Sequence, residues 1–197
     1  MQVRLDKRAR IIADGGQAYP VDLLRDHTLV QVRQKYTDDT GELTLAPGEE
    51  TTDEVTVGGR VVFVRNTGKL CFASLQDGFT ETSNGERLQI MLSKAEVGDE
   101  SLAAWKSDVD LGDHVWVRGR VVVSRRGELS IMAAEWRMAS KALRPLPTLH
   151  KELSEETRVR RRYADLVVRE ESRQMVRTRA VITRAAVSYT HLRAHET

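Results

Sequence analysis

The sequence has one cysteine, few aromatic residues and no long apolar run. Cys71 is the only cysteine among 197 residues, which excludes an internal disulfide framework and a cysteine-rich zinc site. No apolar run reaches the roughly 20 residues that a membrane-spanning helix needs, and residues 1–10 lack the apolar core of a secretory signal. We therefore expect a cytoplasmic protein, in a reducing compartment and without a membrane segment.

Charge is nearly balanced overall but uneven along the chain. The formal net charge is +2. Residues 37–56 contain seven acidic residues, no basic one, two glycines and a proline, a composition that predicts a solvated loop. Residues 158–184 contain nine arginines against three acidic residues. This second stretch is interpreted either as a surface that binds a polyanion or as a helix with a solvated face.

The spacing of apolar residues changes from helical to alternating near Glu54. Before that point it predicts two short helices, over 3–13 and around 29–36, the second capped by Asp26 or Thr28. After it, alternation predicts five strands, with one helix between the third and the fourth. The strands are expected over 54–65, 70–76, 87–93, 114–124 and 128–136, and the helix over 94–107. This order predicts an OB-fold, a small five-stranded barrel, although other five-stranded topologies share it.

Alternation also separates the inward side chains of each strand from the outward ones. In the second strand Cys71, Ala73 and Leu75 form the apolar set, so Phe72 faces outward. An outward phenyl ring forgoes about 1.5–3 kcal/mol of burial unless something covers it. OB-folds that bind single strands use such a ring to stack an unpaired base, which contributes roughly 1–3 kcal/mol.

Three polar residues are expected on the same outer face as Phe72. They are Arg65 at the end of the first strand, Gln89 in the third and Glu128 at the start of the fifth. Gln89 carries both a donor and an acceptor, Arg65 donates and Glu128 accepts, which suits a base such as uracil with one ring N–H and two carbonyls. The alternative is that the N-terminal helices or the loop over 78–85 cover Phe72, and that the polar residues are ordinary surface.

Five short motifs occur along the chain: Ala18-Tyr19-Pro20, Leu75-Gln76-Asp77, Gly127-Glu128-Leu129-Ser130, the run Lys141–Pro147 and the run Arg158–Leu166. Together they resemble motifs of bacterial class II lysyl-tRNA synthetases, in which the run at Lys141–Pro147 is the linker between two domains. The resemblance covers residues 3–187 and implies the N-terminal part of such an enzyme, without its catalytic motifs. The implied fold is mainly β with helices: an OB-fold barrel preceded by N-terminal helices and followed by a linker and the first helices of a class II catalytic domain.

The resemblance implies five segments. Residues 1–52 are the N-terminal helical segment and acidic loop, and 53–140 the anticodon-binding OB-fold. Residues 141–153 are the linker, and 154–187 the start of the catalytic domain. Residues 188–197 do not continue the family pattern, so they are expected to be a non-native tail.

The resemblance also implies a function. The family enzyme is a homodimeric lysine–tRNA ligase that activates lysine with ATP and Mg²⁺ and charges tRNA(Lys). Phe72 would stack on the central anticodon uridine, Gln89 and Arg65 would bond that base, and Glu128 would contact the anticodon. No catalytic, cofactor-binding or metal-binding residue is assigned, so this chain alone is expected to be inactive. The alternatives are a stand-alone OB-fold protein that binds single-stranded nucleic acid, and an aspartyl- or asparaginyl-tRNA synthetase relative.

Overall fold

The computed structural model describes residues 1–78, 86–147 and 153–194. The chain divides into two compact units, Met1–Pro145 and Leu146–Thr197. The division falls inside the expected linker, of which residues 148–152 lie outside the described part. Each unit is considered by itself, and the expected domain limits remain predictions.

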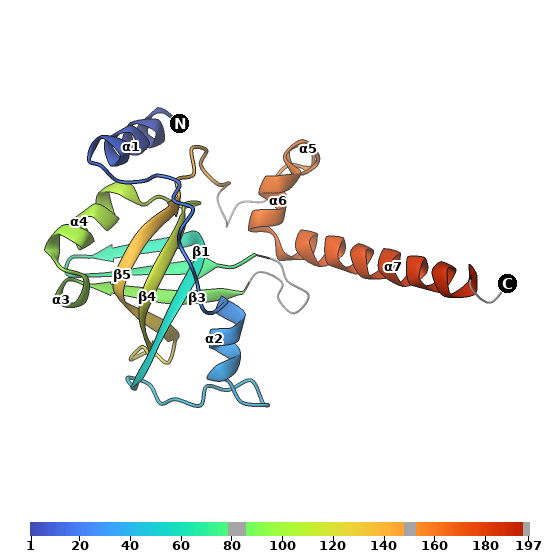
Figure 1. The fold of residues 1–197 in the computed structure, drawn as a ribbon, viewed down its shortest axis with the longest axis horizontal. Coiled ribbons are helices and arrows are strands. Elements are labelled where there is room, and N and C mark those ends of the chain that lie inside the picture. The colour runs from blue at the N-terminus through green and yellow to red at the C-terminus, as the bar shows by residue number, and fades with distance from the viewer. Residues whose placement is uncertain (79–85, 148–152, 195–197) are drawn as a thin grey trace. The chain divides into compact units, whose positions relative to one another are not determined.

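Five strands form a closed barrel in the first unit (Figure 1). They are β1 (Glu50–Thr67), β2 (Leu70–Gln76), β3 (Arg87–Ser93), β4 (His114–Val123) and β5 (Leu129–Ser140). Their order around the barrel is β1-β2-β3-β5-β4, and β4 pairs back onto β1. Only the β3–β5 pair is parallel. This topology, with a helical segment between β3 and β4, confirms the predicted OB-fold.

On β2, β3, β4 and β5 the barrel core comes from the inward side that alternation predicted. Leu75, Ile90, Val117 and Ile131 are all fully buried. Gly119 allows the strands to close, because a Cβ at that position would lie 2.0 Å from the carbonyl oxygen of Met132 on β5. A side chain larger than hydrogen therefore does not fit at the bulge where β4 pairs with β5.

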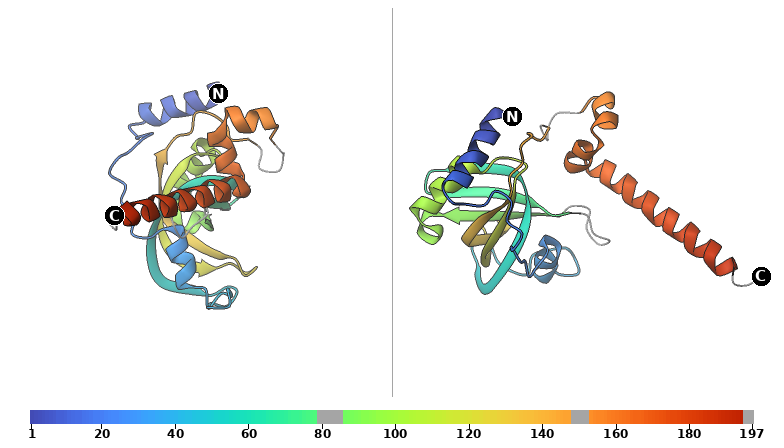
Figure 2. Two further views of the ribbon diagram at one scale, coloured as in Figure 1. Left: turned by 90° about the vertical axis from the view of Figure 1, so that its right-hand side faces the viewer. Right: turned by 45° about the horizontal axis from the view of Figure 1, so that its top comes forward.

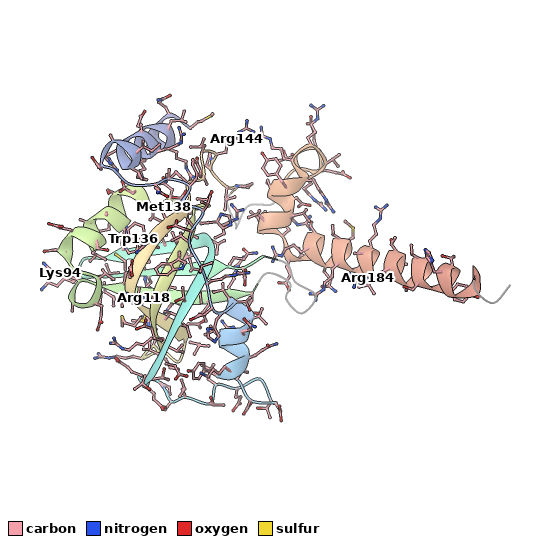
Figure 3. The ribbon with its side chains drawn as sticks, in the orientation of Figure 1. Lys94, Arg118, Trp136, Met138, Arg144 and Arg184 are labelled. Carbon is pink, nitrogen blue, oxygen red and sulfur yellow. The ribbon has the colours of Figure 1, made fainter. Side chains whose placement is uncertain are left out.

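Two short helices stand where one was predicted between β3 and β4. They are α3 (Lys94–Val97) and α4 (Asp99–Asp108), separated by Gly98. The prediction of one continuous helix was wrong because Gly98 adopts φ +83°, a left-handed conformation that ends the first helix. Trp105 of α4 is buried and packs edge-on at 5.1 Å against Trp136 of β5, which is labelled in Figure 3.

The N-terminal helices are α1 (Gln2–Ala13) and α2 (Leu29–Lys35). Thr28, not Asp26, caps α2, through a capping box with Gln31. The Asp26 carboxylate instead accepts a hydrogen bond from the backbone N–H of Thr56 at 2.7 Å. These contacts position α2 beside the barrel strands β1 and β3 (Figure 2).

A buried ion cluster fastens the chain where it leaves β5. The Lys141 ammonium donates to the carboxylates of Asp110 at 2.6 Å and Asp113 at 2.7 Å, and to the Asp108 carbonyl at 2.7 Å. Asp113 also accepts from the backbone N–H groups of Asp110 and Ala142. Burial by itself would raise the pKa of Asp110, but the neighbouring ammonium groups lower it below its usual value.

The second unit consists of three helices, α5 (Glu155–Arg160), α6 (Arg162–Val168) and α7 (Glu170–Ala194). Ser154 caps α5 as predicted. Asp165 is buried and accepts from Arg162 and from Ser172, both at 2.7 Å, so part of the arginine-rich stretch has an internal role. None of the helices in the described ranges is both long and apolar enough to span a bilayer.

Helix α7 continues past the expected end of the native sequence. It was predicted over 170–187 and extends to Ala194, while residues 195–197 lie outside the described part. The helix therefore includes most of the segment 188–197, whose non-native origin remains a prediction.

Candidate nucleic-acid interface

The strand register places outward side chains in two rows across β1, β2, β3 and β5. The first row is Phe63, Ser74, Gln89 and Ser130, and the second is Arg65, Phe72, Met91 and Met132. The residues between them on β2, β3 and β5, namely Ala73, Ile90 and Ile131, are buried inside the barrel, and Val64 on β1 is partly buried. The two rows thus form one continuous outer face beside the β4–β5 turn.

A groove of about 910 Å³ lies over this face. Its lining comprises Gly48, Glu50, Phe63, Arg65, Leu70, Phe72, Gln89, Met91, Val122, Val123, Ser124, Arg125, Arg126, Glu128 and Met132. All four residues singled out from the sequence, Arg65, Phe72, Gln89 and Glu128, therefore lie in one groove. This volume is at the upper end of the range typical for small-ligand pockets, so the groove has room for nucleotides.

Phe72 is half-buried, and its ring meets a cation rather than a helix. The Arg65 guanidinium lies over the ring, 4.8 Å from its centroid, an arrangement that contributes about 0.5–1 kcal/mol at an exposed site. Neither α1 nor α2 contributes a residue to the groove lining. Residues 79–85 of the alternative covering loop lie outside the described part. Among the described residues, the Phe72 ring therefore borders the groove and has the flat Arg65 guanidinium as its charged neighbour.

Hydrogen bonds fix the orientation of the Gln89 amide. Its Nε2 donates to the Ser130 hydroxyl at 2.9 Å, and that hydroxyl donates in turn to the Glu128 carbonyl at 2.9 Å. Because the hydroxyl has a single hydrogen, it can only accept from Gln89, so the amide nitrogen must face it. The Gln89 Oε1 and the second amide hydrogen remain for a ligand. Ser130, the middle member of this relay, is itself fully buried although it lies on the outer side of β5.

Glu128 stands at the end of the tight β4–β5 turn. Gly127 takes φ +81°, and the Ser124 hydroxyl accepts from the Glu128 N–H at 3.0 Å. The carboxylate side chain is 55% exposed, and its cationic neighbour Arg33 is 3.9 Å away. Glu128 is therefore a solvent-facing acceptor at the rim of the groove.

Among the lining residues that the sequence analysis did not name, three have side chains suited to a nucleic acid: Phe63, Arg125 and Arg126. Alternation failed in β1 because a register shift between Val61 and Phe63 breaks it, with Val61 and Val62 both buried. The two arginines fall between the fourth and fifth predicted strands, where the sequence analysis assigned no site residue. Their adjacent charges were the available signal, but their proximity to β1 depends on the strand register, which the sequence does not display.

The free positive charges of the groove are its arginines. Arg65, Arg125 and Arg126 have no carboxylate partner within residues 1–78, 86–147 and 153–194. Glu50, by contrast, is engaged by Arg120 at 3.0 Å. A groove lined by unpaired guanidinium groups attracts a polyanion.

An OB-fold whose outer groove combines an accessible aromatic ring, an oriented amide and unpaired arginines defines a nucleic-acid-binding domain. Consistent with this, the family model of the OB-fold nucleic acid binding domain matches residues 55–139.

The chain is also similar to several lysine–tRNA ligases. It is 59% identical over 185 residues to that of Kineococcus radiotolerans, covering 94% of this chain and 35% of the relative. It is 54% identical over 187 residues to that of Mycolicibacterium gilvum, with 95% and 35% covered. The lysine–tRNA ligase 1 of Mycobacterium tuberculosis H37Rv is 53% identical over 184 residues, with 93% and 34% covered. The chain is thus similar to lysine–tRNA ligases over nearly its whole length, and it spans about a third of the length of these relatives.

Proposed function

We propose that this chain binds the anticodon of tRNA(Lys) as part of a cytoplasmic, homodimeric lysine–tRNA ligase, and that α5–α7 begin its class II catalytic domain. The relatives named above are lysine–tRNA ligases. ATP and Mg²⁺ serve the activation of lysine in the complete enzyme. The described residues contain no group of three or more His, Cys, Asp or Glu that could hold a metal ion, so none is assigned to Mg²⁺.

The orientation of Gln89 is the observation that carries this proposal. With its nitrogen turned toward Ser130, its Oε1 presents an acceptor to the groove. Uracil has an N3–H to donate to this oxygen, whereas N3 of cytosine is itself an acceptor. A base stacked on Phe72, on the neighbouring strand, brings that edge toward Gln89, and Arg65 can donate to a uracil carbonyl. The fit of the N3–H of uracil to Gln89 Oε1 is the basis on which we propose a uridine at the stacked position.

Binding to anticodon stem-loops tests the proposal. We expect the purified chain to bind a UUU loop more tightly than GUC or GUU loops, measured by fluorescence anisotropy at one fixed salt concentration. Equal affinity for the three loops would point instead to a sequence-tolerant single-strand binder. Preference for a GUC or GUU loop would point to an aspartyl- or asparaginyl-type specificity.

Removal of the stacking ring tests the role of Phe72. Phe72→Ala should weaken binding of the UUU loop by about 1–3 kcal/mol, or about 5- to 150-fold. Leu111→Ala is the matched control, since Leu111 is a 44% exposed apolar side chain of the same unit that does not line the groove. An unchanged affinity of Phe72→Ala, with the control also unchanged, refutes the stacking role.

The chain alone is expected to bind tRNA without catalysis. Lysine-dependent ATP–pyrophosphate exchange should be undetectable with the purified 197-residue chain. Exchange above background, absent from a preparation without this chain, would contradict this expectation.

A further inference from the structure

Phe63 is an exposed aromatic ring that the proposed function does not use. Its side chain is 51% exposed, and it lines the same groove as Phe72. The register shift between Val61 and Phe63 turns it outward, because Val61 and Val62 both take buried positions. An exposed phenyl ring forgoes favourable burial, so its position in a ligand groove calls for a partner.

The two rings have a spacing that suits neighbouring nucleotides. Phe63 pairs with Ser74, and Phe72 lies two residues before Ser74 on the same face of β2. Such diagonal neighbours lie about 7–8 Å apart. Arg65, two residues after Phe63 on β1, stands beside Phe72. Ser74 lies between Phe63 and Gln89 in the first row. Because its side chain is small, it leaves space beside the Phe63 ring on the side of Gln89.

Positive charge faces Phe63 from the β4–β5 turn. Arg125 and Arg126 are exposed and line the groove together with Phe63. Within the described part of the chain neither is paired with a carboxylate. An aromatic platform next to unpaired guanidinium groups is the combination with which proteins hold a single strand, since the ring stacks a base and the cations bind its phosphates.

We propose that Phe63 stacks a second unpaired base, adjacent to the base on Phe72, and that Arg125 and Arg126 bind the phosphates beside it. The groove thus holds at least two consecutive nucleotides of a single-stranded RNA loop. This inference rests on the proposed function and extends its binding site by one nucleotide position.

The first test compares variants on one RNA. Phe63→Ala should weaken binding of the UUU stem-loop about 5-fold or more, while Leu111→Ala leaves it unchanged. Phe63→Leu should show a similar loss, because leucine keeps apolar volume but has no flat face. Thermal melting by circular dichroism should match the wild type for both Phe63 variants, since the ring is exposed. Wild-type affinity of Phe63→Ala overturns the proposal, and wild-type affinity of Phe63→Leu overturns stacking as its basis.

A second test removes the base instead of the ring. Loops with an abasic nucleotide immediately before or after the central anticodon position are titrated with wild type and Phe63→Ala. For one of the two loops the variant and the wild type should bind equally, because the base that Phe63 stacks is already missing. A full Phe63→Ala loss on both loops contradicts the proposal.

The outcomes separate this inference from the proposed function. If Phe72→Ala weakens binding and Phe63→Ala does not, the proposed anticodon site is supported and the second stacking position at Phe63 is refuted. If the wild type binds none of the loops, the proposed function itself is refuted.

For the double variant Arg125→Ala, Arg126→Ala, the slope of log K against log salt should become shallower by about 1.4, at about 0.7 for each phosphate contact of a single strand. An unchanged slope overturns the phosphate contacts.

Discussion

Lys141→Ala should be the costliest single truncation of a polar side chain in the first unit. The Lys141 side chain and its partner Asp113 are both 0% exposed, and removal of one partner of a buried ion pair costs about 3–5 kcal/mol. Asp113 keeps two backbone N–H donors, which favours the lower end, about 3 kcal/mol. For a chain of this size that corresponds to a fall in melting temperature of about 6–12 °C.

Thermal unfolding followed by circular dichroism at neutral pH measures this loss. Lys7→Ala is the matched control, because Lys7 also pairs with Asp110, at 2.8 Å, but from a side chain that is 19% exposed. Loss of this more accessible pair should cost about 1 kcal/mol or less. Equal melting temperatures for Lys141→Ala and Lys7→Ala would refute the argument that burial of the cluster sets its contribution.

Three further predictions concern the groove, a partly buried imidazole and the bulge between β4 and β5. Ser130→Ala removes the bond that orients the Gln89 amide, so preference for a UUU over a UCU loop should fall about 5-fold, or about 1 kcal/mol; an unchanged ratio contradicts the relay. Burial lowers the pKa of His114 to about 4. As the pH falls below 6.5, the unfolded state therefore binds a proton that the folded state does not bind. The free energy of unfolding then declines until the pH reaches the folded-state pKa. Between pH 7 and 5, the free energy of unfolding of His114→Asn should fall less than that of the wild type. The difference should be at most about 2 kcal/mol, because the ring is partly solvated. Urea midpoints that change with pH in parallel for the two proteins would contradict this. Gly119→Ala should destabilise the barrel by about 1–3 kcal/mol or more. Gly58→Ala is the control and should cost less, because its Cβ would meet its nearest atom at 3.8 Å. Equal melting temperatures of the two variants would contradict the steric explanation.

The strand pattern was predictable wherever alternation and turns agreed. β2 and β3 have the predicted limits, since turn signals bound both strands and every second residue of each is a buried apolar one. β1 was predicted from Glu54 but begins at Glu50, within the acidic stretch that was expected to be a loop. The acidic side chains are compatible with a strand there because Arg118 and Arg120 on β4 pair with Glu54 and Glu50. Pairing partners so distant in sequence are not visible in local composition.

The candidate site was predictable where it follows from alternation within one strand, and not where it depends on the register between strands. Phe72 and Gln89 were identified by their side of a strand, and the groove indeed contains both. Phe63 was missed because a one-residue irregularity reverses the faces of a strand. The relay through Ser130 was missed because it joins two strands whose register is set by barrel closure. Local periodicity identifies faces, whereas the alignment of one strand against another is a property of the folded molecule.

The cation over Phe72 has a consequence for how fast an RNA leaves. If Phe72 stacks a base as proposed, that base displaces the Arg65 guanidinium, which lies 4.8 Å from the ring centroid. The displaced cation contributes about 0.5–1 kcal/mol at an exposed ring, so it offsets part of the stacking energy of the base. In the free chain the guanidinium covers the apolar face of the ring, and its return would shorten the residence time of a bound RNA.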